Sequence, residues 1–482
     1  MPARRSPSVV VIGAGLGGLA AAIRLIAAGC DVTLIEAQSS TGGRAGQIRD
    51  AGFVFDTGPT LITLPELVDE LFQLAGSSMT SELRMHSLDP FYRIAWEDDP
   101  RVFYFNGNRE AMRHEIGKFS AIDARHLDAF LDASAVIYKE TILKAAHHSF
   151  LHFTDFLEVV PAMVRLGAIG STDSFVGRFF KEPHVRQAFS FHPLFIGGDP
   201  YRVPAVYSAV AFMEMSGGVW YPEGGIGALV TALERLVRKR GRVITGDPVA
   251  TIVQRGSRAV GVRTESGASY PADFVVSNAD LVTTHRQLLS DPGRHEPRLS
   301  MSCFQLYLGT SRTFPGLTHH TLLVGRAYRR FMRDVTDARR MPQTLSLYVD
   351  APSRTEPAMA PPGGESIMAL LPVPNLSGNG LWPEMEGWLR NRMLSVLESH
   401  SALGLSGLAD SIVVEHHQSP VDFRDRLRSA DGNGFGPEPT LFQSTYFRQH
   451  NRDERLGGLY YAGAGTHPGA GIPGVLLGAE VT

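Results

Sequence analysis

Residues 8–36 read SVVVIGAGLGGLAAAIRLIAAGCDVTLIE, and this stretch decides the fold. Apolar β-forming residues run into a glycine-rich turn at 13–18, and an apolar helical pattern and a second strand pattern follow. The spacing predicts a strand over 8–13, a helix over 16–28 and a strand over 31–36. A strand, turn, helix and strand within about 30 residues form a βαβ unit that carries the fingerprint of a dinucleotide site.

The residues of this unit have separate tasks at such a site. Gly13 permits the tight turn, Gly15 lets the backbone approach a pyrophosphate, and Gly18 lets helix and strand pack closely. The phosphates would meet the free N–H groups at the positive end of the helix dipole. Glu36 ends the second strand, where a carboxylate accepts hydrogen bonds from a ribose 2′-OH and repels a 2′-phosphate. The unit therefore favours FAD or NAD and speaks against NADP.

A second glycine-rich motif lies at the opposite end of the chain. Residues 459–475 read LYYAGAGTHPGAGIPGV, which predicts a strand, a glycine-rich turn and a final helix from about Val475 to Thr482. Gly42-Gly43-Arg44 follows the second strand, where a flexible turn can bring a guanidinium to a phosphate. Together the motifs indicate one nucleotide cofactor held by both ends of the polypeptide.

The composition is that of an ordinary globular protein. The 482 residues exceed what one hydrophobic core usually spans, and the net charge of −3 gives no reason to expect a nucleic-acid partner. Cys30 and Cys303 are too few for a disulfide framework, so we expect a reducing cytoplasm. Arg4-Arg5 before an apolar stretch imitates a secretory signal, but Arg24 interrupts the apolar run within one helix length. No segment offers the roughly 18 uncharged apolar residues of a membrane span.

The patterns predict a discontinuous organisation. Helical patterns dominate 109–185, and strand-like runs return after residue 241 and again within 303–350. We expect three parts: a cofactor-binding domain over 1–75, 220–290 and 430–482; a substrate-binding domain over 76–108, 186–219 and 291–429; and a helical subdomain over 109–185.

Four motifs together carry a family resemblance. Glu36, Gly42-Gly43-Arg44, the 52–59 segment and the 463–475 segment resemble the FAD-dependent amine oxidase and phytoene desaturase superfamily. Within that superfamily, further segments are similar to the bacterial-type carotenoid desaturases, and they lie at 191–198, 217–227, 419–423 and 466–474. The similarity covers nearly the whole chain.

The resemblance implies the fold and the cofactor. The expected fold is α/β: a Rossmann-like FAD-binding domain of the GR2 flavoprotein type, with an inserted mixed-sheet substrate domain and a helical, membrane-facing subdomain. The residues implied to bind FAD are Gly13, Gly15, Leu16, Gly17, Gly18, Glu36, Gly43, Arg44, Gly58, Pro59, Thr60, Val249, Gly465, Gly471, Ile472, Pro473 and Val475. The final helix ends about two turns after Val475, whereas relatives continue further, so we expect a shortened C-terminus.

The implied activity is the desaturation of a carotene, from phytoene toward zeta-carotene, neurosporene or lycopene. A hydride goes to the flavin, which quinone or oxygen then reoxidises. A polyene has no polar handle, so it binds by burial in an apolar tunnel. Large apolar residues suit such a tunnel, although each also suits an ordinary core: Phe175, Phe179, Phe180, Phe189, Phe191, Phe195 and Trp220. No catalytic base stands out; His192 and Glu223 are weak candidates for which a structural role is the alternative.

Two further expectations concern the membrane and metals. Residues 141–169 belong either to the core or to a surface helix that dips into lipid. If they form a surface helix, we expect a cytoplasmic protein that binds peripherally to the membrane. The adjacent pairs His147-His148, His319-His320 and His416-His417 do not share a helix face, so we predict no metal site.

Other activities stay open. Carotenoid saturases, isomerases and ketolases belong to the same wider family, and an FAD amine oxidase is a second possibility that the apolar central block argues against. A non-catalytic prenyl-lipid carrier, like the Rab GDP-dissociation inhibitors, has a related fold without using flavin. Bound flavin separates the carrier from the enzymes.

Overall fold

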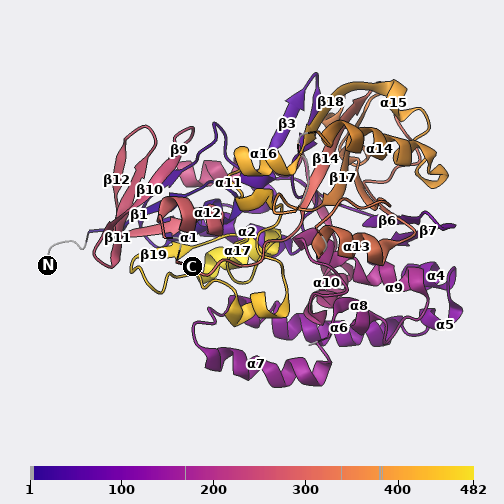
Figure 1. Ribbon diagram of the computed structural model, residues 1–482, viewed down its shortest axis with the longest axis horizontal. Coiled ribbons are helices and arrows are strands. Elements are labelled where there is room, and N and C mark those ends of the chain that lie inside the picture. The colour runs from indigo at the N-terminus through magenta and orange to yellow at the C-terminus, as the bar shows by residue number, and fades with distance from the viewer. Residues whose placement is uncertain (1–4, 169, 292, 338, 379–381, 383) are drawn as a thin grey trace.

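The computed structural model describes residues 5–168, 170–291, 293–337, 339–378, 382 and 384–482. Figure 1 shows two sheet-containing halves side by side, with a group of helices along one edge of the molecule. A parallel sheet contains β1 and β2, the two strands of the predicted βαβ unit. A larger mixed sheet forms the core of the other half.

The parallel sheet is the Rossmann-like element. Its strands lie in the order β19 (Leu459–Tyr461), β13 (Phe274–Ser277), β1 (Ser8–Ile12), β2 (Asp31–Ile35) and β9 (Arg242–Ile244). Each neighbouring pair is parallel, so the carboxyl ends of β1, β13 and β19 meet at one edge. Helix α1 (Leu16–Ala27) connects β1 to β2, which confirms the predicted βαβ unit. The edge where these strands end is where α/β folds bind ligands.

The two ends of the chain pack against each other. Strand β19 pairs with β13, and the final helix, α17 (Ile472–Val481), packs on α1. The expected start of this helix at about Val475 is wrong, since it begins three residues earlier at Ile472. Pro473 lies in its first turn, where a missing N–H breaks no intrahelical hydrogen bond.

The mixed sheet has seven strands. In spatial order they are β18 (Ile412–Gln418), β14 (Ser302–Thr310), β17 (Glu365–Val373), β16 (Leu347–Asp350), β15 (His320–Val324), β6 (Tyr92–Trp96) and β7 (Asp99–Phe105). Only β15 and β6 run parallel. The remaining strands form small sheets: β3 (Gln47–Asp50) with β4 (Phe53–Asp56), β5 (Met85–Ser87) with β8 (Trp220–Pro222), and β10 (Val249–Arg255), β11 (Arg258–Thr264) and β12 (Ser269–Pro271).

Helices cover the sheets and fill the predicted helical segment. Those within 109–185 are α4 (Arg109–Gly117), α5 (Ala121–Ala124), α6 (Leu127–Thr141), α7 (Phe153–Leu166), α8 (Thr172–Val176) and α9 (Pro183–Ser190). The others are α2 (Pro65–Leu74), α3 (Met79–Glu82), α10 (Ala209–Gly217), α11 (Ile226–Arg238), α12 (Leu281–Thr283), α13 (Tyr328–Thr336), α14 (Glu386–Ser399), α15 (Leu408–Ser411) and α16 (Pro420–Asp425). Figure 1 places α7 at the outer edge of the helical group.

The apolar stretch at 141–169 is not one continuous helix. It contains a short 3-10 turn at 145–147 and then α7, which has Pro161 inside it. Among the residues that the structure describes, no helix is both long enough and apolar enough to cross a bilayer.

The close contact between α1 and β1 generates the first prediction. A Cβ on Gly18 would overlap the carbonyl oxygen of Gly13, and neither backbone segment can move away independently. We expect Gly18→Ala to lower the thermal unfolding midpoint by about 1–3 °C, because overpacking costs roughly 1–3 kcal/mol and the unfolding entropy of a chain this long is large. Gly117→Ala is the matched control, since nothing lies within 4 Å of the added methyl. Unchanged stability of Gly18→Ala in a thermal melt would contradict this packing.

Candidate functional site

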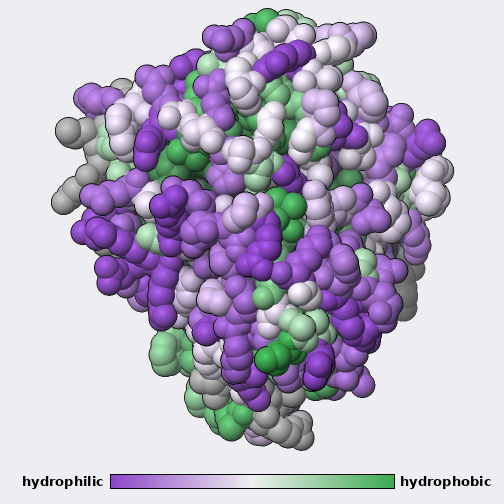
Figure 2. All heavy atoms as spheres, turned by 90° about the vertical axis from the view of Figure 1, so that its right-hand side faces the viewer, coloured by the Kyte–Doolittle hydropathy of each residue, from purple (hydrophilic) through white to green (hydrophobic). Residues whose placement is uncertain are grey.

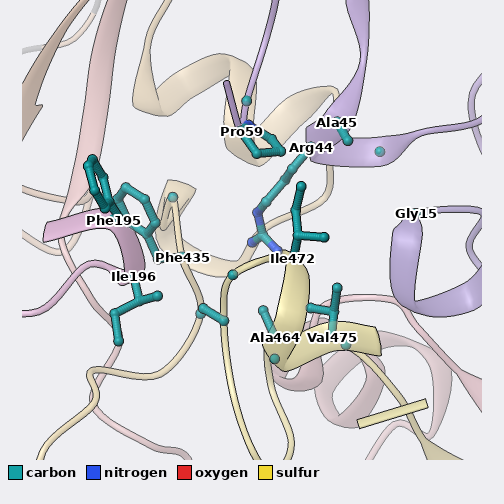
Figure 3. Close-up of a pocket in the computed structure, with 18 of the residues that line it drawn as sticks. Gly15, Arg44, Ala45, Pro59, Phe195, Ile196, Phe435, Ala464, Ile472 and Val475 are labelled. Atoms are coloured by element: carbon teal, nitrogen blue, oxygen red, sulfur yellow. The ribbon is translucent and has the colours of Figure 1, made fainter. Parts of the chain in front are cut away.

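One large cavity, of about 550 Å³, opens at the carboxyl edge of the parallel sheet and continues toward the mixed sheet. Every predicted FAD residue lines it except Gly18, which packs against the Gly13 carbonyl as described above. Residues from both ends of the chain meet there: Figure 3 shows Gly15, Arg44 and Ala45 opposite Ala464, Ile472 and Val475, with Phe195, Ile196 and Phe435 farther along.

The glycine-rich segments touch backbone to backbone. Gly15 pairs with Gly42 in an isolated parallel bridge, and a Cβ on Gly17 would lie 3.0 Å from the Gly463 Cα. Gly15 precedes the first turn of α1 and no side chain caps this helix end. Its N–H groups therefore stay available to an anion in the cavity, where the helix dipole adds to their attraction.

Glu36 is buried and held in place at the end of β2. The backbone N–H of Ala14 donates to its Oε2 at 2.6 Å, and the N–H of Gln38 donates to its Oε1 at 2.9 Å. A carboxylate fixed in this way on the cavity wall is suited to accept from ribose hydroxyls. The same bonds tie the second strand to the glycine-rich turn.

Arg44 lies in a short 3-10 turn, Gly43–Ala45, and extends along the cavity in Figure 3. Its Nη2 donates to Ser429 Oγ at 2.8 Å and lies 3.9 Å from Asp280 Oδ2. Burial lowers the pKa of Arg44, an effect that Asp280 partly opposes, and the buried Nε has no hydrogen-bond partner. A desolvated cation with an unused donor fits the pyrophosphate of FAD.

Several cavity residues were not identified from the sequence. They include Asn278 and Asp280 after β13, and Ser429 before the final motif. Asn433, behind the lining, contacts Arg44 as well. Asn278 donates to the Ala462 carbonyl at 3.1 Å and so joins the two glycine-rich segments. The sequence does carry a signal for Asn278 and Asp280, because both directly follow a predicted strand. The carboxyl end of that strand lies beside the carboxyl end of β1.

The other end of the cavity is mainly apolar. Its lining there includes Ile142, Leu194, Ile196, Met213, Leu323, Leu347, Leu370 and Phe435. Of the aromatic residues considered for a tunnel, Phe191 and Phe195 line it, whereas Phe175, Phe180 and Phe189 are buried in the core. Phe179 and Trp220 pack against that core as well. Thr60 and Tyr348 join by a 2.6 Å hydrogen bond on the wall between the two ends.

The two weak catalytic candidates have different surroundings. His192 is on the cavity wall, its Nε2 3.1 Å from Glu214 Oε2, and the Tyr92 hydroxyl donates to Glu214 Oε1 at 2.8 Å. Both side chains are about 1% exposed. Each oxygen of Glu214 has a hydrogen-bond partner, whereas the buried Nδ1 of His192 has none. Glu223 lies outside the cavity lining, half exposed and 3.9 Å from Arg84.

Comparisons with known proteins define the class first. The profile of the flavin containing amine oxidoreductases matches residues 16–480. The chain is 40% identical to a phytoene desaturase (lycopene-forming) of Pantoea ananas over 98% of this chain and 97% of that protein. It is 35% identical to a phytoene desaturase (neurosporene-forming) of Rhodobacter capsulatus, with 98% and 92% covered. An oxidoreductase structure from Methanosarcina mazei shares the fold, with a TM-score of 0.66 at 18% identity and 98% of each chain covered.

The chain therefore belongs to the flavin containing amine oxidoreductase family and, within it, to the bacterial phytoene desaturases. The expected Rossmann-like flavoprotein fold and the expected class of oxidoreductase are confirmed. The membrane-facing part of the fold, the domain boundaries and the individual FAD contacts stay predictions.

The fixed carboxylate of Glu36 generates a prediction about flavin binding. We expect Glu36→Ala to raise the dissociation constant for FAD by about 10- to 100-fold, since each hydrogen bond to a charged group contributes roughly 1.5–3 kcal/mol. Flavin fluorescence titration of the purified protein measures this directly. The control is Glu70→Ala, which removes a carboxylate paired with Arg24 outside the cavity and leaves the affinity unchanged. Equal FAD affinity in Glu36→Ala and the unaltered protein would remove Glu36 from the site.

Proposed function

We propose that this chain catalyses the FAD-dependent desaturation of phytoene toward zeta-carotene, neurosporene or lycopene in carotenoid biosynthesis. The observation that carries the proposal is the single cavity, which joins a dinucleotide-binding end to an apolar end. Relatives over nearly the full chain support it, since they include lycopene-, neurosporene- and zeta-carotene-forming phytoene desaturases.

The proposed reaction assigns different work to the two ends of the cavity. Bound FAD supplies the hydride acceptor for one of the two C–H bonds that are broken, and the other hydrogen leaves as a proton. The α1 N-terminus, Glu36 and Arg44 hold the cofactor, while the start of α17 faces the same space and favours negative charge there. The apolar lining binds the polyene by burial and excludes water. Quinone or oxygen is the proposed final electron acceptor.

An apolar surface next to this cavity supports a membrane-bound substrate. Phe153, Leu157 and Val164 of α7 are exposed, as are Phe442 and Phe447 of the 441–447 segment. We call these five residues the apolar rim. Figure 2 shows hydrophobic atoms gathered at the lower end of the molecule, the side on which Figure 1 places α7.

Ring contacts join the two segments of the apolar rim. Phe153 meets Tyr446 with ring centroids 5.5 Å apart, and Phe156 meets Phe447 at 5.1 Å. The chain leading into α7 carries Ile142 and Ala146, which line the cavity. Because phytoene partitions into lipid, we propose that the apolar rim inserts into the membrane surface and that substrate enters from there.

The activity is tested with phytoene-loaded liposomes, the protein and FAD, without nicotinamide cofactor. We expect visible absorbance to appear and move to longer wavelength, because each new double bond lengthens the conjugated chain; the final spectrum counts the steps. Glu36→Ala serves as the control. We expect its reaction to stay colourless at limiting FAD and the colour to return with excess FAD. No colour with flavin bound, and with reoxidation shown to work, would favour another lipid substrate or a saturase, isomerase or amine oxidase. Purified protein without bound flavin would favour the non-catalytic prenyl-lipid carrier.

The apolar rim is tested separately by sedimentation with liposomes. The double variant Leu157→Asp/Phe442→Asp introduces charge at side chains that are 50% and 74% exposed, so folding is expected to be unaffected. We expect at least a tenfold loss of vesicle binding, roughly the cost of withdrawing two large apolar side chains from lipid. Val413→Asp, at a 59% exposed position on edge strand β18, is the control and retains binding. Equal binding of all three proteins would place the membrane contact elsewhere.

A further inference from the structure

A second cluster of ligand-type side chains lies behind the cavity wall, outside the site described above. His320 begins β15 and stands directly opposite Asp350 on β16, and His319 precedes it. All three side chains are fully buried, and one ligand atom from each lies within 4.8 Å of the others. We predicted no metal site at the adjacent histidines because they do not share a helix face. In the structure they are not on a helix, and strand pairing brings the Asp350 carboxylate near the rings of His319 and His320.

The distances within the cluster are too long for good hydrogen bonds. Asp350 Oδ1 lies 3.4 Å from His319 Nε2 and 3.5 Å from His320 Nε2, compared with roughly 2.7–3.2 Å for an N–H···O bond. His319 Nε2 and Asp350 Oδ1 have no hydrogen-bond partner although both are buried. Two unsatisfied buried atoms that face each other across such a gap call for a cation between them.

The Nδ1 atoms of His319 and His320 already have hydrogen-bond partners. His320 Nδ1 lies 3.0 Å from the Phe91 carbonyl, and His319 Nδ1 lies 2.7 Å from Thr355 Oγ1. Both ring nitrogens of His320 lie near backbone carbonyls, since Nε2 is 3.3 Å from the Thr60 carbonyl. With the proton on Nδ1, which makes the shorter contact, the Nε2 lone pair is available to a metal ion beside Asp350. Metal-binding histidines are oriented by outer hydrogen bonds of this kind.

The spacing between the carboxylate oxygen and the two imidazole nitrogens is close to that of a tetrahedral ion. Bonds of about 2.0–2.1 Å place adjacent ligands of a tetrahedron roughly 3.4 Å apart. An octahedral ion with bonds of the same length requires roughly 3.0 Å. The observed 3.4 and 3.5 Å match the tetrahedron. The Thr60 carbonyl, 3.3 Å from His320 Nε2, is a nearby oxygen for a fourth bond.

We propose that His319, His320 and Asp350 bind a structural zinc ion. The ion would link β15 to β16 and, through Thr60, to the segment that lines the flavin cavity. Zinc has no redox chemistry of its own, so it is compatible with a flavin site. This inference does not depend on which carotene the enzyme uses.

The competing occupant of the same space is a proton on the buried Asp350 carboxylate. The two occupants differ in what Asp350→Asn does. An asparagine replaces a protonated acid with little change in shape, whereas it removes the anionic ligand from zinc. Metal content therefore separates the two.

The experiment measures zinc per chain by mass spectrometry in the flavin-loaded protein, produced with added zinc chloride and dialysed. We expect about one zinc per chain in the unaltered protein and at least a tenfold loss in Asp350→Asn and His319→Gln. His86→Gln is the control and keeps its zinc; His86 belongs to a separate, partly exposed group with Glu223 and Glu356. Zinc-free unaltered protein, or full zinc in Asp350→Asn, would overturn the proposal.

A second measurement covers the case in which the variants fail to fold. X-ray absorption at the zinc edge of the unaltered protein is expected to show four nitrogen or oxygen neighbours at about 2.0–2.1 Å, with the signature of imidazole. A spectrum with sulfur neighbours, with six neighbours or without imidazole would place the zinc elsewhere and overturn the assignment.

Discussion

The structure depends on backbone contact between three segments that carry no side chains at the point where they meet. The start of α1 pairs with the 42–43 turn through a Gly15–Gly42 bridge, and it lies so close to the 463–465 turn that a Cβ on Gly17 would come within 3.0 Å of the Gly463 Cα. This contact puts the first and last parts of a 482-residue chain on one cavity wall. It also leaves the first N–H groups of α1 without side-chain caps, so the same glycines that close the fold provide an anion site.

The charges around Arg44 are suited to an anionic ligand. Arg44 is partly buried beside Asp280, Ser429 and Asn433, and its buried Nε keeps an unused donor. Burying a cation costs free energy that its protein partners offset only in part. If Arg44 contacts the cofactor as predicted, the anion supplies further compensation, and cofactor binding and folding are expected to stabilise each other.

The apolar end of the cavity follows a different principle. A hydrocarbon substrate offers no hydrogen bonds, so specificity rests on the shape of the lining and on the absence of unsatisfied polar groups. One polar pair, His192–Glu214, lies on the same wall, and Glu214 also accepts from the Tyr92 hydroxyl. The arrangement leaves the redox chemistry to the flavin and gives the protein the tasks of positioning both reactants and excluding water.

The sequence by itself determined the βαβ unit, the residues of the glycine-rich turns and the family, because these depend on local periodicity and on positions that only glycine tolerates. Tertiary structure alone decided which distant residues join them. Asn278 and Asp280 reach the cavity through parallel strand pairing, and His320 meets Asp350 through an antiparallel register. It also decided that Phe191 and Phe195 line the cavity while Phe175 and Phe189 fill the core. Those outcomes depend on contacts between segments far apart in the chain, and an apolar side chain has the same local pattern in either place.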